Sequence, residues 1–202
     1  MTFQAIIGYP GVGIAAENQA ESPFWKGNLI EVLGQLAGLK TGKKLLKAIG
    51  SAQPEYVKPG LTPGENVRIY PLLGGAYLRQ KPSGEIGPNE ASPGALPDKM
   101  KAALGRDGVM GSTVYVNWSN SAAILMRSQL IHPAVVLGHE LIHALHFLTG
   151  TGRQDYMEEE MMTIGFGTVD DVTFDPEDKD TLPPLCDNRL RWDLGIARRT
   201  EY

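Results

Sequence analysis

The segment 132–150, HPAVVLGHELIHALHFLTG, constrains this chain more than any other part, because it contains all four histidines of the sequence. Leucines recur through it at the spacing of one buried helix face, at Leu137, Leu141, Leu145 and Leu148. Pro133 suits the first turn of a helix, and Gly150 suits the position just past its end. The pattern therefore predicts one helix with an apolar face and several imidazoles.

His139, Glu140 and His143 form an H-E-x-x-H motif inside this helix. Side chains four residues apart lie on the same helix face, so both imidazoles can bind one ion. A shuffled chain of this composition would contain the motif roughly 0.005 times, and the motif is typical of zinc metalloproteases, in which the glutamate is the general base. The alternative is a buried helix whose histidines only form hydrogen bonds. Two imidazoles beside a carboxylate are costly to bury, however, unless a partner such as a metal pairs them.

A catalytic zinc usually has three protein ligands and a fourth position for water, so the motif needs one more ligand. His146 lies on the same helix face but roughly 10 Å beyond the first motif histidine, so we expect it to support the ligands or to pack. Glu158–Glu160 begin a segment that predicts a second helix, which ends at Gly165. Adjacent glutamates are ordinarily a solvated helix start. The incomplete ligand set upstream nevertheless favours one of these three glutamates as the missing ligand.

The rest of the chain predicts an α+β domain. Periodicity and composition predict helices at 29–36 and 41–49, strands at 66–71, 76–79 and 113–118, and a Pro- and Gly-rich loop at 80–98. Thr41 is the expected N-cap of the second of these helices. Strands placed before long helices suggest an α+β fold with its chemistry on the later helices. A length of 202 residues fits a single domain spanning 1–202, with 1–22 as a candidate flexible end.

Charge and cysteine content exclude several classes of protein. The chain has 19 basic and 23 acidic residues, a formal charge of −4, which argues against a nucleic-acid partner because such proteins are usually basic. No apolar run reaches the roughly 18 residues of a membrane-spanning helix, and the N-terminus lacks the features of a cleaved secretory signal. We therefore expect no membrane partner, and the sequence does not indicate an oligomer. Cys186, the single cysteine, cannot form an intramolecular disulfide and is expected to be buried.

The stretch 170–180, DDVTFDPEDKD, is strongly acidic but lacks the spacing of a calcium-binding EF-hand loop. A solvated loop is the simpler interpretation. The alternative is a rim that attracts basic substrate segments.

Two segments of the chain resemble known zinc proteases. His139–Gly150, HELIHALHFLTG, is similar to the active-site helix of the clostridial neurotoxin light chains, which carry HELIHxLHxLxG. Those proteases also have a Glu-Glu-x-x-Thr-x-Gly segment, and Glu159–Gly165 fits that pattern. The resemblance implies that Glu160 is the third zinc ligand, with Glu159 in a supporting position.

The end of the chain resembles the NleD-like (M91) effector peptidases, a family of comparable length. The similar run is Asp187–Gly195, DNRLRWDLG, followed by Arg199 and Tyr202. Arg-x-x-Tyr lies beside the scissile carbonyl in the neurotoxin proteases. The resemblance therefore implies that the Tyr202 hydroxyl donates to the oxyanion and that Arg199 holds the tyrosine or shares the charge. Asp187 is a candidate to orient Arg199.

These resemblances imply a zinc endopeptidase with a zincin-like α+β core, in which a small mixed sheet packs on the helix that bears HExxH. One Zn2+ ion would be bound by His139, His143 and Glu160, with Glu140 as the general base. The M91 resemblance further implies a bacterial effector, delivered by type III secretion without a cleaved signal peptide. Its expected place of action is the host cytosol, and its expected partner is a host signalling protein, a MAP kinase in the best-known branch.

Two other functions remain open at the level of sequence. One is a metal-stabilised binding module without catalysis, against which the intact Glu140 argues. The other is a toxin protease domain that acts on a bacterial competitor, with the same chemistry and a different target.

Overall fold

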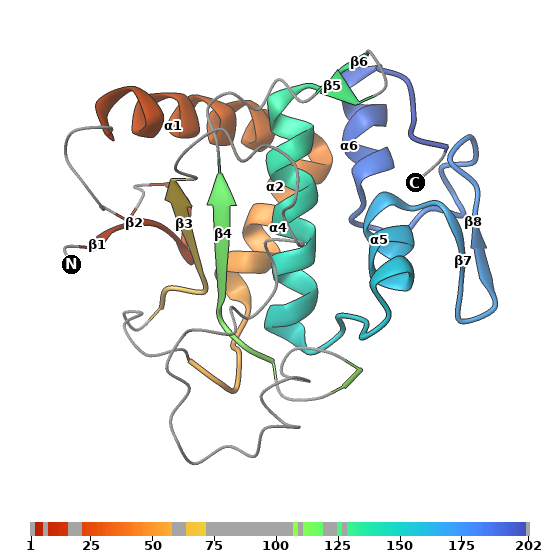
Figure 1. Ribbon diagram of the computed structural model, residues 1–202, viewed down its shortest axis with the longest axis horizontal. Helices are drawn as coiled ribbons and strands as arrows, with labels where there is room; N and C mark the ends of the chain where they lie inside the picture. Colours follow the sequence, from red (N-terminus) through yellow and green to blue (C-terminus); the bar gives the residue numbers. More distant parts are fainter. Residues whose placement is uncertain are drawn as a thin grey trace.

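The computed structural model describes residues 3–5, 8–15, 22–57, 64–71, 107–108, 111–118, 125–126 and 129–200 (Figure 1). The described helices are α1 (Ser22–Gly38), α2 (Lys40–Ser51), α4 (Pro133–Thr149), α5 (Tyr156–Ile164) and α6 (Asp187–Leu194). The strands are β1 (Phe3–Ala5), β2 (Val12–Ala15), β3 (Val67–Pro71), β4 (Val114–Trp118), β5 (Leu125–Met126), β6 (Gln129–Leu130), β7 (Gly167–Val169) and β8 (Val172–Phe174). This mixture of helices and small sheets is compatible with the α+β class.

The largest described sheet is mixed and has the strand order β1-β2-β3-β4. β1 and β2 are antiparallel, whereas β2, β3 and β4 run parallel. In β3 and β4 the fully buried valine and isoleucine side chains are in register, Val67 with Val114 and Ile69 with Val116. Both strands had been expected from alternation, at 66–71 and 113–118. β1 and β2 fall within 1–22, the range suggested as a flexible end.

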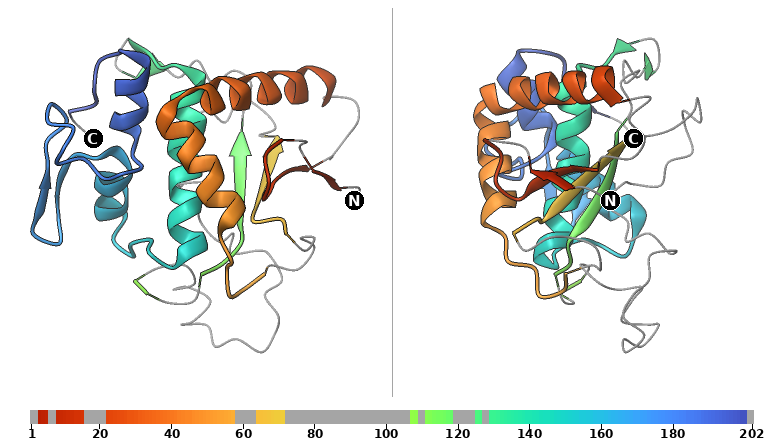
Figure 2. Two further views of the ribbon diagram at one scale, coloured as in Figure 1. Left: turned by 180° about the vertical axis from the view of Figure 1, so that it is seen from behind. Right: turned by 90° about the vertical axis from the view of Figure 1, so that its left-hand side faces the viewer.

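Helix α4 runs through the middle of the molecule. In Figures 1 and 2 it lies between the sheet on one side and α5, α6 and the β7–β8 hairpin on the other. It packs against α1, α2, β4, α5 and α6. The predicted leucine stripe is buried in the core, at Leu137, Leu141, Leu145 and Leu148. One side of α4 therefore anchors the helix in the core, while residues on its other side can meet α5 and α6.

The ends of α4 and α5 follow from their local sequence. The side chain of His132 accepts a hydrogen bond from the Ala134 N–H at the start of α4, and Gly150 ends the helix in the left-handed conformation. Asp155 caps α5 through the Glu158 N–H at 3.0 Å. Because this cap lies upstream of the glutamates, α5 begins at Tyr156, earlier than the predicted Glu158.

The expected cap of α2 is wrong. Thr41 lies inside the helix, which begins at Lys40 after the N-cap Leu39. The Thr41 N–H instead donates to the carboxylate of Asp193, at 2.5 Å. This acceptor comes from α6, 152 residues further along the chain. A backbone N–H in the first turn of α2 is therefore hydrogen-bonded by a distant carboxylate, where the sequence predicted a cap from a side chain of the same segment.

Helix α6 was not predicted. It packs against α4, and it also contacts α2 and α5. Gly138 makes the close approach possible, because a Cβ atom at this position would lie only 2.4 Å from Leu190 Cδ1.

Residues 76–79 and 80–98, predicted as a strand and a loop, lie outside the described residues. Among the helices that the structure describes, none combines the length and the apolar character needed to cross a membrane.

Candidate metal centre and active site

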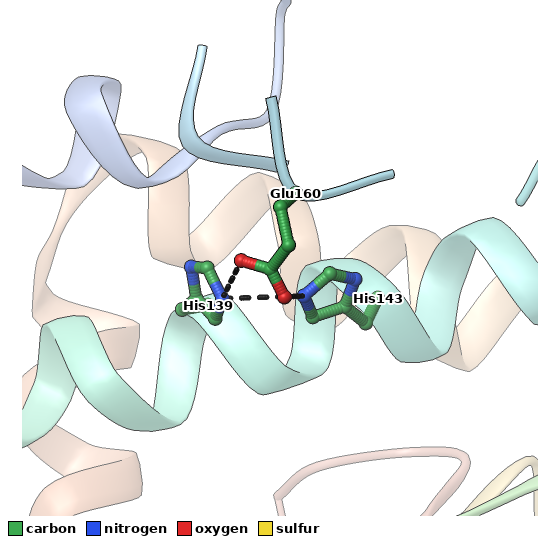
Figure 3. A group of neighbouring side chains, drawn as sticks. All are labelled: His139, His143 and Glu160. Atoms are coloured by element: carbon green, nitrogen blue, oxygen red, sulfur yellow. Dashed lines mark hydrogen bonds and ion pairs between the residues drawn. The ribbon is translucent and has the colours of Figure 1, made fainter. Parts of the chain in front are cut away.

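Helices α4 and α5 bring three potential metal ligands together. Figure 3 shows the Glu160 carboxylate extending from α5 to the imidazoles of His139 and His143 on α4. Glu160 Oε2 is 3.4 Å from His139 Nε2, Glu160 Oε1 is 3.2 Å from His143 Nε2, and the two Nε2 atoms are 3.2 Å apart. The two histidines and the glutamate selected by the family resemblance therefore face one point.

These separations fit a zinc site. In a tetrahedral site with metal–ligand distances of about 2.0–2.1 Å, neighbouring ligand atoms lie about 3.4 Å apart. The two Nε2 atoms are 3.2 Å apart, and each lies 3.2 or 3.4 Å from one oxygen of the Glu160 carboxylate, separations close to that value. The imidazole rings are nearly perpendicular, at 83°, so each directs one edge toward the shared point. The His143 side chain is fully buried and that of His139 is 14% exposed, which leaves access from the His139 side.

The other ring nitrogen of His143 is held by a carboxylate. Glu159 Oε1 lies 2.8 Å from His143 Nδ1, and the Thr163 hydroxyl donates to the same oxygen at 3.3 Å. Because ionised Glu159 can only accept, the proton of a neutral His143 resides on Nδ1. The lone pair is then on Nε2, which faces Glu160 and His139. This arrangement is the usual support for a metal-binding histidine.

Glu159 has four donors in its surroundings, although it is almost fully buried. His146 Nδ1 approaches Oε1 at 2.8 Å, and the backbone N–H of Arg153 donates to Oε2 at 2.8 Å. Burial alone would raise the pKa of this carboxyl group, but the hydrogen bonds from His143 and His146 outweigh it and lower the pKa to about 2. His146 thus takes the supporting position expected for it, through Glu159.

Helix α6 supplies a carboxylate to the other histidine. Asp187 Oδ2 is 3.5 Å from His139 Nδ1, a long ion-pair distance, and no better-placed acceptor for this nitrogen is found among the described residues. The opposite oxygen, Asp187 Oδ1, accepts from the Arg191 guanidinium one helical turn away. Asp187 was considered only as a partner of Arg199. The structure places it against His139 and Arg191.

Electrostatics at the site favour positive charge. Burial lowers the pKa of His139, but the carboxylates of Asp187 and Glu160 more than compensate and raise the pKa to about 10. For the Glu160 carboxyl group burial acts in the opposite direction and raises the pKa, but hydrogen bonds and charge interactions with His139 and His143 lower the pKa well below its usual value. A buried cluster that stabilises added positive charge this strongly is suited to a divalent cation. The donor set, two imidazole nitrogens and a carboxylate, is one that zinc commonly binds.

The remaining predicted residues are only partly placed. Glu140 follows His139 on α4, is partly buried, and its charge contributes to the raised pKa of His139. Arg199 lies on the segment after α6 and is held through its backbone by Asn188. Tyr202 lies outside the described residues.

Three polar residues of α6 are buried beside the site, namely Asp187, Asn188 and Arg191. Sequence reasoning missed the roles of Asn188 and Arg191, and it missed the contact of Asp187 with His139. The i,i+4 spacing of Asp187 and Arg191 in an otherwise polar run was the available signal for a helix here. No local pattern indicates that this helix packs on the HExxH helix.

Comparison with known proteins identifies a family for this chain. Residues 17–202 match the sequence profile of peptidase family M91, described as an effector protein. The match covers α1 to α6, and so includes every side chain of the site described above. Comparison with curated proteins finds no match.

Proposed function

Because this chain belongs to the M91 peptidase family of effector proteins, we propose that it is a zinc-dependent endopeptidase that acts on a host protein. Family membership supports a protease with a protein substrate. The zinc dependence rests on one observation, the convergence of His139, His143 and Glu160 with both Nε2 atoms facing the carboxylate.

The chemistry divides between the metal and the chain. Zinc bound by the three ligands would supply Lewis acidity, lowering the pKa of a water molecule to about 7 and polarising the scissile carbonyl. Glu140, next to the first ligand on α4, would be the general base, taking a proton from the attacking water and passing it to the leaving amine. Arg199 and the Tyr202 hydroxyl stabilise the negative charge that develops on the carbonyl oxygen.

The proposal extends to architecture and setting. We propose a single domain over 1–202 with a zincin-like core, supported by the position of α4 between the sheet and α5. Membership of an effector family supports delivery into a host cell. The family resemblance also supports a signalling protein, such as a MAP kinase, as the substrate.

The decisive experiment compares the zinc-loaded parent with Glu140→Gln in host-cell lysate, with new protein N-termini identified by mass spectrometry. We expect the parent to make a small set of cleavages that the variant does not make. A chelator should abolish the same cleavages by the parent, and added zinc should restore them. Zinc content and melting temperature of the variant should equal those of the parent. Glu158→Gln, an exposed glutamate of α5, serves as the matched control and should cleave normally.

Three outcomes would contradict the proposal. Cleavage that survives chelation or Glu140→Gln would exclude the zinc mechanism. Host-cell effects that persist with Glu140→Gln would favour a non-catalytic binding module. Cleavage confined to bacterial lysate would favour an antibacterial toxin.

A further inference from the structure

Asn188 holds the backbone of Arg199 at two points. The Arg199 N–H donates to Asn188 Oδ1 at 2.7 Å, and Asn188 Nδ2 donates to the Arg199 carbonyl at 2.9 Å. One side-chain amide therefore pairs with both polar backbone groups of one residue, as a neighbouring strand would. The Asn188 side chain is fully buried, so its amide would be left without polar partners if these bonds were broken.

The same amide reaches the helix that carries Glu160. Asn188 Nδ2 also donates to the carbonyl of Gly165 at 3.2 Å, and Gly165 is the left-handed residue that ends α5. Asn188 thus joins the segment after α6 to the end of α5. Its sequence neighbour Asp187 faces His139 on α4. The first turn of α6 therefore contacts both ligand-bearing helices and the segment that carries Arg199.

The neighbours of Arg199 are attached to the surface of α6 and its surroundings. The Arg198 guanidinium stacks over the Trp192 ring at 4.2 Å and pairs with Glu177, and the Ala197 carbonyl accepts from Arg191. Arg198, Glu177 and Ala197 are at least partly exposed, whereas the Asn188 side chain is fully buried. Two backbone hydrogen bonds therefore hold the main chain at residue 199, from which the Arg199 side chain extends.

We propose that Asn188 is a positioning residue for catalysis, which sets the place of Arg199 relative to the metal-binding residues of α4 and α5. This inference rests on the proposed function, in which Arg199 stabilises the transition state. The Asn188 side chain forms its hydrogen bonds with Gly165 and Arg199 and not with the three proposed metal ligands. Its effect on the reaction is transmitted through the backbone of Arg199.

A double-mutant cycle separates positioning from simple stabilisation. In the zinc-loaded parent we expect Asn188→Ala to lower kcat about 10- to 100-fold, the usual effect of displacing a catalytic group, with KM changed less than about two-fold. In an Arg199→Ala background the same substitution should lower kcat further by less than about two-fold, because the group it positions is gone. Asn188→Asp keeps the acceptor for the Arg199 N–H and should recover part of kcat.

Asn66→Ala is the matched control. Asn66, directly before β3, is also a buried asparagine, and its Nδ2 donates to two carbonyls at the end of α2, those of Ile49 and the C-cap residue Ala52. We expect it to lower the melting temperature as Asn188→Ala does, while kcat at a temperature where both variants are folded stays at the parent value. Hydrogen exchange should show lost protection of the Arg199 amide in Asn188→Ala only.

The outcomes distinguish this inference from the function on which it rests. If the parent shows no zinc-dependent cleavage, the proposed function fails and the inference fails with it. If the parent cleaves but the effects of Asn188→Ala and Arg199→Ala on kcat multiply, only the positioning role is overturned. Unchanged protection of the Arg199 amide in Asn188→Ala would overturn it as well. If Asn188→Ala does not fold, kcat of Asn188→Asp in the parent and in the Arg199→Ala background decides the question by the same comparison.

Discussion

Glu159 Oε1 lies 2.8 Å from His143 Nδ1, and this contact determines which nitrogen of the imidazole is available at the site. The acceptor is buried, ionised and supplied with further donors, so it holds the Nδ1 proton firmly. The Nε2 atom then faces Glu160 with a lone pair. The residue beside the proposed ligand is therefore as much a part of the site as the ligand itself.

Glu159→Gln should weaken zinc binding about 10- to 100-fold, because the amide has no charge with which to polarise His143 and cannot accept on both of its polar atoms. Competition with a chromophoric chelator measures the affinity. Glu158→Gln, exposed on the same helix, is expected to bind zinc like the parent. Equal affinities for the two variants would show that Glu159 does not support the metal site.

Glu160→Gln should abolish tight zinc binding and with it the stabilisation by zinc. A ligand present at about 1,000 times its Kd stabilises the folded state by about 4 kcal/mol, so the melting temperature of the parent should rise with added zinc. The variant should melt at the same temperature with or without the metal. A zinc-dependent shift of parental size in Glu160→Gln would exclude this residue as a ligand.

Tyr202→Phe tests the terminal Arg-x-x-Tyr pair with the loss of a single oxygen atom. Removing one donor to an oxyanion typically lowers kcat about 10²- to 10³-fold. KM and zinc content should remain at the parent values, because the hydroxyl is expected to act only in the transition state. Parental kcat in steady-state cleavage of a peptide substrate would remove Tyr202 from the mechanism.

Gly165→Ala should destabilise the protein more than Gly195→Ala does. Both glycines end helices with positive φ, at 75° and 67°. A Cβ at Gly165 would lie 2.7 Å from the Cys186 sulfur, whereas a Cβ at Gly195 would meet no described residue within 4 Å beyond its neighbours in the chain. We expect a loss of about 2–4 kcal/mol at Gly165 and about 1 kcal/mol at Gly195 in urea unfolding. Equal losses would mean that the structure relaxes freely around Cys186.

Cys186 should resist alkylation in the folded protein. The side chain is fully buried, and burial raises its pKa to about 12, so the reactive thiolate is scarce at pH 8. Labelling by iodoacetamide should proceed only as fast as the protein unfolds, and should be rapid in guanidinium chloride. Fast stoichiometric labelling of the native protein would show that the region around α6 opens readily.

The HExxH helix and its neighbour could be predicted because their information is local. Periodic leucines, Pro133 and Gly150 predicted α4 nearly to its ends, and four of its core positions are buried as expected. The spacing of His139 and His143 follows from helical geometry alone. The convergence of Glu160 on them required the family resemblance, since three adjacent glutamates are equivalent by spacing.

Other parts of the protein depend on contacts that no local pattern records. Asp193 caps α2, and Asp187 meets His139, across long stretches of chain. Thr41 was a reasonable cap by its residue type, yet a carboxylate from α6 satisfies its own backbone N–H. Such contacts form only when packed helices bring distant groups together, and their partners are ordinary polar residues in the sequence.

By itself the sequence determined the helix that carries HExxH and the placing of His139 and His143 on one face of it, because helical periodicity and side-chain chemistry act over a few residues. The tertiary structure alone decided which side chains support that set. Glu159 meets His143 and Asp187 meets His139 because α5 and α6 pack against α4. Asn188 ties Arg199 to the end of α5 for the same reason. Packing brings these groups together, and burial makes their hydrogen bonds strong enough to matter.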